Sequence, residues 1–201
     1  MADRQTLAAV QRHDQEIRKS RFVVHAAPVD SVDEALAFVA RLADPAATHN
    51  CWAYRIGQQY RFNDDGEPAG TAGKPILQAI DGQGLDDVAV LVIRWFGGIK
   101  LGAGGLMRAY GGCAAQCLRA APRLLKRDLA RASCFVDYAD LALLKARVQQ
   151  AGAAIELESF EATGARLSLA IAQAERDALE ALVNDLTRGR GQWQPYSGKN
   201  A

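Results

Sequence analysis

The sequence lacks several features that mark specialised classes of protein. It has almost no net charge, because 24 lysines and arginines face 23 aspartates and glutamates. This balance gives no overall attraction to nucleic acid or membrane, so any nucleic-acid site must be a local patch. The N-terminus has no apolar signal core, and no apolar run reaches membrane-spanning length. We therefore expect a cytoplasmic globular protein.

Cysteine is also scarce and forms no C-x-x-C pair. The four cysteines are Cys51, Cys113, Cys117 and Cys134. A chain of 201 residues can build a core without disulfides, so we expect these thiols to be reduced and mostly buried. Cys113 and Cys117 would share a helix face, where a buried apolar pair is a far commoner arrangement than a metal site. The cysteines therefore predict no metal site, and the sequence predicts no cofactor.

Three ligand-binding templates are absent. The Walker pattern requires glycine at position 68 and a hydroxyl residue at position 75, and the chain has proline at both. The dinucleotide fingerprint fails at Met107, where glycine is required. Residues 63–66 lack the spacing of a Ca²⁺-binding loop. These departures argue against a nucleotide-hydrolysing or NAD-binding protein.

The stretch 61–75 has an unusual composition, with three carboxylates, three glycines and two prolines. Such a segment is a poor strand or helix interior, but its glycines and prolines fix a backbone path. Pro75 suits the start of a short helix, so the amides of residues 70–74 should precede a helix N-terminus, which favours an anion. Lys74 adds positive charge. The carboxylates Asp64, Asp65 and Glu67 would either neutralise this first loop or hold a metal.

A second loop, residues 97–105, is rich in glycine. It follows Val88–Ile93, a continuous apolar run that predicts a central strand buried on both faces. It precedes a predicted helix that ends at Ala121, and strand, glycine loop and helix start form the general layout of a phosphate cradle. Gly111 and Gly112, inside that helix, indicate close backbone packing.

We predict that the two loops meet and form an anion-binding or nucleic-acid-binding surface. The alternative is that they only join two elements tightly. The densest basic cluster, residues 18–21, would either contact phosphate or be a charged, solvated strand edge. The candidate site residues are Arg18, Lys19, Arg21, Asp64, Asp65, Glu67, Gly70, Thr71, Gly73, Lys74, Arg94, Gly97, Gly98, Lys100, Gly102, Gly104, Gly105 and Arg108.

The pattern of the chain changes after Pro122, which predicts domains at 1–126 and 127–201. In the first, Ser31–Ala43 has a helical stripe with a capping box, and His49–Ile56 is typical of a strand. The second has the order βαββαβ, which predicts a ferredoxin-like sandwich. Its open sheet face lacks the stacked aromatics of an RNA-recognition sheet and favours protein contact or docking. The residues expected on that face are Arg131, Phe135, Glu156, Glu158 and Arg166.

Three blocks closely resemble the IMPACT family, in particular its bacterial YigZ branch: Glu16–Phe22, Asn63–Pro75 and Arg94–Gly112. The resemblance implies an α+β protein. Its N-terminal α/β domain would be similar to a ribosomal-protein domain with a left-handed βαβ crossover. Its C-terminal domain would be ferredoxin-like, as in elongation factor G. Eukaryotic relatives look like regulators of a translation-control kinase pathway that act through an extra domain, so their partner is not carried over.

Three functions follow as hypotheses. The first is a non-enzymatic binding protein, linked to translation through RNA or ribosome contact at the two loops, and such binding should weaken with salt. The second is a hydrolase-type enzyme that uses Asp64, Asp65 or Glu67 beside Lys74, and it requires convergent carboxylates. The third is a protein–protein regulator that acts through the open sheet of the second domain. Fold-level analogy alone does not choose among them.

Overall fold

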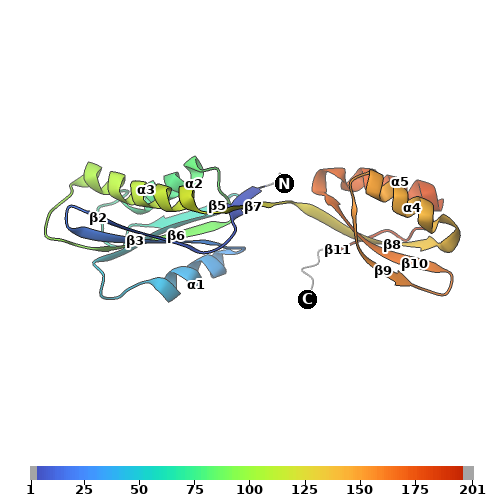
Figure 1. Cartoon of the computed structure of the whole chain (residues 1–201), viewed down its shortest axis with the longest axis horizontal. Helices are drawn as coiled ribbons and strands as arrows, with labels where there is room; N and C mark the ends of the chain where they lie inside the picture. Colours follow the sequence, from blue (N-terminus) through green and yellow to red (C-terminus); the bar gives the residue numbers. More distant parts are fainter. Residues whose placement is uncertain (1–3, 197–201) are drawn as a thin grey trace. The chain divides into compact units, whose positions relative to one another are not determined.

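The computed structural model describes residues 4–196, which form two compact units, residues 4–126 and the chain from Arg127 onward. Each unit has its own main sheet (Figure 1). The buried apolar clusters also divide between the units, with two in the first and one in the second. Together the units form a mixed α+β protein, as predicted. Among the described residues, each helix is too short or too polar to span a membrane.

The first unit is built on a five-stranded antiparallel sheet with the order β2-β3-β6-β4-β5. A two-stranded ribbon of β1 and β7 stands beside it, and β7 is an element that the sequence pattern did not indicate. The strands are β1 (Arg4–Leu7), β2 (Gln11–Ile17), β3 (Ser20–Pro28), β4 (His49–Ile56), β5 (Gln59–Asn63), β6 (Val88–Trp95) and β7 (Arg123–Lys126). The helices are α1 (Val32–Leu42), α2 (Gly73–Gly82) and α3 (Ala103–Ala120).

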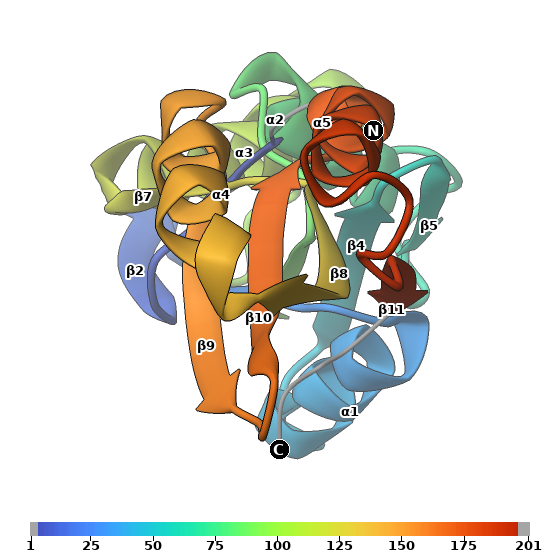
Figure 2. The ribbon, with the colours of Figure 1, turned by 90° about the vertical axis from the view of Figure 1, so that its right-hand side faces the viewer.

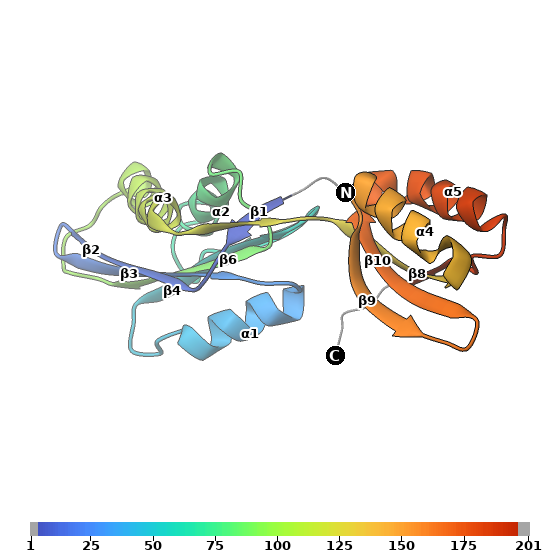
Figure 3. The same ribbon diagram turned by 45° about the vertical axis from the view of Figure 1, so that its right-hand side comes forward.

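The central strand β6 is buried on both faces, which confirms the prediction from its apolar run. Successive side chains of a strand point to opposite faces of the sheet. Val88, Val90 and Val92 therefore lie in the core under α2 and α3, whereas Leu91 and Ile93 lie in the core against α1. Figure 3 shows α1 on one side of the sheet and the other two helices on the opposite side. β6 thus separates two apolar layers.

The sheet contains two crossovers of opposite hand. β3 and β4 are both antiparallel to β6, so they are parallel to each other and are joined through α1. By the same pairing, β5 and β6 are parallel and are joined through α2, with β4 between them. The two connections run in opposite directions across the sheet. A half turn about the sheet normal superimposes their directions but leaves their helices on opposite faces. One crossover is therefore left-handed, as the family resemblance implied, against the usual right-handed rule.

Local signals account for α1 and miss the hairpin that precedes it. The Ser31 hydroxyl accepts the Glu34 N–H at 3.2 Å, as the predicted capping box requires. The Glu34 carboxylate accepts the Asp30 N–H at 2.7 Å, so the return bond of the box is displaced by one residue. β2 and β3 are joined by a tight turn at Arg18 and Lys19, with φ values of 47° and 64°. Glycine and asparagine usually mark such turns. Arginine and lysine are not typical of such turns, so the sequence did not predict this one.

The two adjacent glycines of α3 have different surroundings. A Cβ on Gly111 would lie 3.4 Å from the Cβ of Pro75, so close packing against α2 is confirmed there. A Cβ on Gly112 would meet nothing within 4 Å, so the packing interpretation is wrong for that residue. α2 begins at Gly73, two residues before the predicted start at Pro75.

The second unit has the predicted ferredoxin-like topology, with the sheet order β11-β8-β10-β9. Its core lies between this sheet and two helices (Figure 2). The strands are β8 (Leu129–Asp137), β9 (Ala154–Phe160), β10 (Gly164–Ala172) and β11 (Gln194–Tyr196). The helices are α4 (Tyr138–Gln150) and α5 (Arg176–Thr187), the latter preceded by a short 3₁₀ turn, Gln173–Glu175.

One residue predicted for the open sheet face lies on the other face. Glu158 is opposite the buried Leu167, and its carboxylate accepts a hydrogen bond from Lys145 of α4 at 2.7 Å. Glu156 remains on the open face, where it pairs with Arg131 at 3.0 Å. The register of β9 shifts at Glu156, because Ser168 is opposite Leu157 while the next residue, Leu169, is opposite Ile155. A strict alternation therefore placed Glu158 wrongly, and Leu157, 64% exposed, is on the open face instead.

Candidate functional site

Asp64 holds the first loop in place. Its carboxylate accepts the backbone N–H groups of Gly70, Ala72 and Gly73 at 2.8, 3.0 and 2.8 Å. The Thr71 N–H and hydroxyl both donate to the Pro68 carbonyl. The prediction that these amides are available to an external anion is therefore wrong. The hydrogen bonds between the loop amides and the Asp64 carboxylate fix the backbone path of the loop.

The other two carboxylates of the first loop also have internal partners. The Asp65 carboxylate accepts the Asn50 N–H at 2.6 Å. Glu67 Oε1 accepts the Tyr110 hydroxyl at 2.7 Å and an Arg94 N–H at 2.6 Å. No group of three or more metal-ligating side chains occurs in the described part of the chain. The carboxylates thus brace the loop, and the proposed roles as metal ligands or as a general base lose their support.

The ion pair of Glu67 and Arg94 is buried. The two side chains are only 4% and 5% exposed. Arg94 also donates to the Ser20 hydroxyl at 3.3 Å, and its guanidinium lies over the rings of Phe22 and Phe96. Arg94 was predicted as an anion-binding residue on the surface. The structure instead makes it the internal counterion of Glu67.

His49 completes this cluster. A histidine at the start of a strand favours a hydrogen bond to a loop over metal ligation, and the structure confirms this role for His49. Its Nδ1 lies 2.7 Å from the Asp65 carbonyl oxygen, which can only accept, so Nδ1 carries the proton. The other ring nitrogen, Nε2, lies 3.7 Å from Glu67 Oε1. In the neutral ring Nε2 is therefore an acceptor. The only sequence signal was a histidine at the start of a strand.

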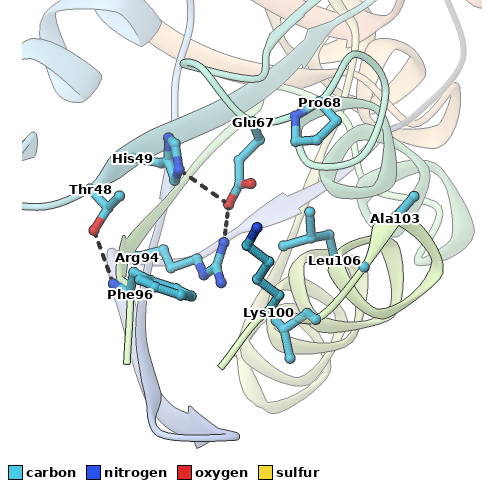
Figure 4. Close-up of a pocket in the computed structure, with 11 residues that line it drawn as sticks. Thr48, His49, Glu67, Pro68, Arg94, Phe96, Lys100, Ala103 and Leu106 are labelled. Atoms are coloured by element: carbon cyan, nitrogen blue, oxygen red, sulfur yellow. Dashed lines mark hydrogen bonds and ion pairs between the residues drawn. The ribbon is translucent and has the colours of Figure 1, made fainter. Parts of the chain in front are cut away.

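The two loops meet at a cavity of about 390 Å³ (Figure 4). The first loop contributes Glu67 and Pro68, and the second contributes residues 100–103. Phe96 and Leu106 add apolar surface. In Figure 4 the side chains of Arg94, His49 and Lys100 are grouped around the Glu67 carboxylate. The remaining lining residue is Thr48.

A second cavity, of about 260 Å³, lies beside the start of α3. It is lined by Arg18 from the hairpin turn and by Arg108 from α3, with Leu101 shared between the two cavities. Gly97 brings the turn and the second loop together, because a Cβ there would lie 1.9 Å from the Lys19 carbonyl oxygen. The turn, the second loop and the first turns of α3 therefore form one surface, which we call the loop-2 face.

The basic residues of the loop-2 face have no acidic partners. Among the described residues, Arg18, Lys19, Lys100 and Arg108 make no ion pair, and their side chains make no hydrogen bond. Arg21 differs, because it pairs with Asp14 at 3.4 Å and lies over the Trp95 ring. Lys74 is exposed in the first turn of α2 and has no partner in residues 4–196.

The start of α3 adds backbone donors to this surface. Gly102 is the N-cap with a φ of 70° and gives no side-chain cap. The Leu106 N–H makes the first helical hydrogen bond, to the Gly102 carbonyl. The preceding N–H groups, of Ala103, Gly104 and Gly105, have no acceptor within the described chain. Gly98 has a φ of 87°, which favours glycine. In the second loop the predicted free donors are present.

Comparison with known proteins places this architecture in a family. The sequence profile of the Impact N-terminal domain matches residues 18–118, and that of a domain of unknown function (DUF1949) matches residues 134–190. An IMPACT family member of Thermus thermophilus is 48% identical over 180 residues, covering 87% of this chain and 97% of that protein. The chain belongs to the IMPACT family.

Other IMPACT family members match over different shares of their length. The member YigZ of Escherichia coli is 38% identical, over 87% of this chain and 89% of its own. Rat Protein IMPACT is 38% identical over 95 residues, which are 42% of this chain and 29% of that protein. A crystal structure described as a hypothetical protein matches 99% of this chain with a TM-score of 0.68 and 36% identity. The loop-2 face lies within the matched N-terminal domain.

Proposed function

We propose that this IMPACT family member is a non-enzymatic binding protein that contacts the phosphate groups of RNA, free or in the ribosome, through the loop-2 face. The observation that carries the proposal is the set of cations without partners around the start of α3. Phosphate oxygens are accepted by arginine, lysine and the free N–H groups of a helix N-terminus. The loop-2 face offers all three kinds of donor.

The loop-2 face differs from the rest of the first unit in that its unpaired cations are grouped. Arg55 pairs with Asp81, and Lys126 pairs with Asp87 at 2.7 Å. Arg41, Arg61, Lys74 and Arg119 also make no ion pair among the described residues, but they come from four separate elements. Unpaired cations that face solvent attract an anionic polymer, and the attraction weakens as salt screens it.

The carboxylates that the hydrolase hypothesis requires are engaged in hydrogen bonds within the fold. Asp64, Asp65 and Glu67 all accept hydrogen bonds from the loop or its neighbours. Burial raises the pKa of the Cys51 thiol to about 12 and that of Cys113 to about 11, so these thiols are not nucleophiles near neutral pH. The four cysteines are free and buried, which also supports our proposal of a cytoplasmic location.

Replacing Arg18 and Arg108 together with glutamine should weaken RNA binding about tenfold or more at low salt. Each lost phosphate contact should also reduce the slope of log affinity against log salt by about 0.7 to 1. Fluorescence anisotropy with a labelled single-stranded RNA at several salt concentrations measures both quantities. The matched control is Arg119→Gln, in the last turn of the same helix. An unchanged affinity and slope in the double variant, or an equal loss in the control, would refute the loop-2 face as the phosphate site.

A further inference from the structure

We propose that the 390 Å³ cavity beside the loop-2 cations takes one unpaired nucleobase, so that the ligand is a single-stranded or looped-out nucleotide and not a duplex. This inference rests on the proposed function. The base would be the part of the ligand that enters the protein, and a requirement for an unpaired base selects single-stranded over duplex nucleic acid.

The two neighbouring cavities differ in polarity in the same way as the base and the phosphate of a nucleotide. One is mostly apolar, with Phe96, Leu101 and Leu106 in its wall. The other is lined by Arg18 and Arg108. Leu101 is common to both, so a group in one is adjacent to a group in the other. A nucleotide matches this arrangement, because its flat base suits the apolar cavity and its phosphate suits the cavity with the two arginines.

Phe96 is held as a stacking platform. Its backbone N–H donates to the Thr48 hydroxyl at 2.9 Å, and the Arg94 guanidinium lies 5.5 Å from its ring centroid. One face of the ring therefore rests on a side chain that is itself fixed by Glu67. The residue is still 46% exposed, which leaves ring surface for a ligand. Unstacked bases in RNA complexes characteristically pack on such rings.

The Glu67 carboxylate at the cavity floor disfavours a phosphate in direct contact with it. Glu67 is neutralised by Arg94, and its buried Oε1 faces the ring of His49. A second anion placed there would meet this carboxylate in a poorly solvated site. His49 Nε2 can accept a hydrogen bond and the Lys100 ammonium can donate one, which suits the edge of a base. The phosphate is better held outside, by Arg18 and Arg108.

A base within a duplex must leave its stack and its pairing partner to enter the cavity, and this removal costs free energy. A single strand presents its bases without that cost. The loop-2 face should therefore discriminate by strand state and by the presence of a base. It should show little dependence on sequence, since stacking does not distinguish the bases strongly.

The test uses the full chain with four probes: a short labelled single-stranded RNA of mixed sequence, the same strand with abasic sites, the corresponding duplex, and adenosine monophosphate. We expect the intact single strand to bind about tenfold or more tightly than the abasic strand or the duplex, on the scale of base–aromatic stacking. Phe96→Ala should remove that difference. Phe62→Ala, an exposed aromatic on β5 outside the cavity, should retain it. Thermal unfolding checks that both variants fold.

Each outcome has one meaning. If the duplex and abasic strand bind as tightly as the intact strand, or if Phe96→Ala changes nothing, the base site is refuted while phosphate binding stands. If no RNA probe binds at low salt, both proposals fail. Adenosine monophosphate that binds as tightly as the intact strand would assign the cavity to free nucleotides and overturn RNA as its ligand.

Discussion

Replacing Asp64 with alanine is expected to lower the free energy of unfolding of the first unit by about 3 kcal/mol or more, because hydrogen bonds to a charged group contribute about 1.5 to 3 kcal/mol each and three backbone donors share this carboxylate. The three N–H groups lie in a tight path between Gly70 and Gly73, where no other described acceptor replaces the lost oxygens. Urea unfolding followed by tryptophan fluorescence measures the change.

The control for this variant is Glu16→Ala. Glu16 is an acidic residue of the same unit whose side chain has no partner among the described residues, so its removal should change stability by no more than about 0.5 kcal/mol. A loss below about 1 kcal/mol for Asp64→Ala would show that the three hydrogen bonds do not hold the loop. Hydrogen exchange at Gly70, Ala72 and Gly73 gives the local readout, with faster exchange expected in the variant.

Replacing Glu67 with leucine should cost about 3 to 5 kcal/mol, because it leaves the Arg94 guanidinium buried without its counterion. The companion variant Arg94→Met should cost a comparable amount for the same reason. The double variant should be clearly more stable than either single one, since well-packed apolar residues can replace a buried ion pair at little net cost. Urea unfolding of the four proteins forms a double-mutant cycle.

The cycle also separates pairing from simple packing. Additive losses, with the double variant less stable than both single variants, would contradict a direct pair between Glu67 and Arg94. The Tyr110 hydroxyl shares Glu67 Oε1, so Tyr110→Phe provides a control that removes one donor without unpairing a charge. We expect its cost to be about 1 kcal/mol.

The fold was predictable where a local pattern is strong. β6 is a continuous apolar run and is the central strand, and α1 carries its capping residues in sequence. The order of elements after Pro122 was enough for the ferredoxin-like topology. The misses arise where the backbone departs from a regular period. The register shift of β9 reversed Glu158, and the tight turn at Arg18 and Lys19 uses residues that do not favour positive φ.

The candidate site was predictable in outline but not in its contacts. The glycine and proline content indicated two loops of fixed conformation, and residues of both loops line one cavity. The sequence does not show which donors a carboxylate will accept. Asp64 accepts hydrogen bonds from the amides that were predicted to bind an external anion. The pairing of Glu67 with Arg94 joins residues far apart in the chain. The position of His49 at the start of a strand indicated its hydrogen bond to the first loop, but its approach to Glu67 and the exposure of Phe96 depend on tertiary packing.

Binding at the loop-2 face can be located by following the backbone amide resonances of the full chain while a short single-stranded RNA is added at low salt. We expect the largest shifts at Ala103, Gly104 and Gly105 and at Phe96, and only small shifts at Gly70 and Gly73, whose amides are held by Asp64. The largest shifts at those first-loop amides, or on the open sheet of the second unit, would contradict binding at the loop-2 face.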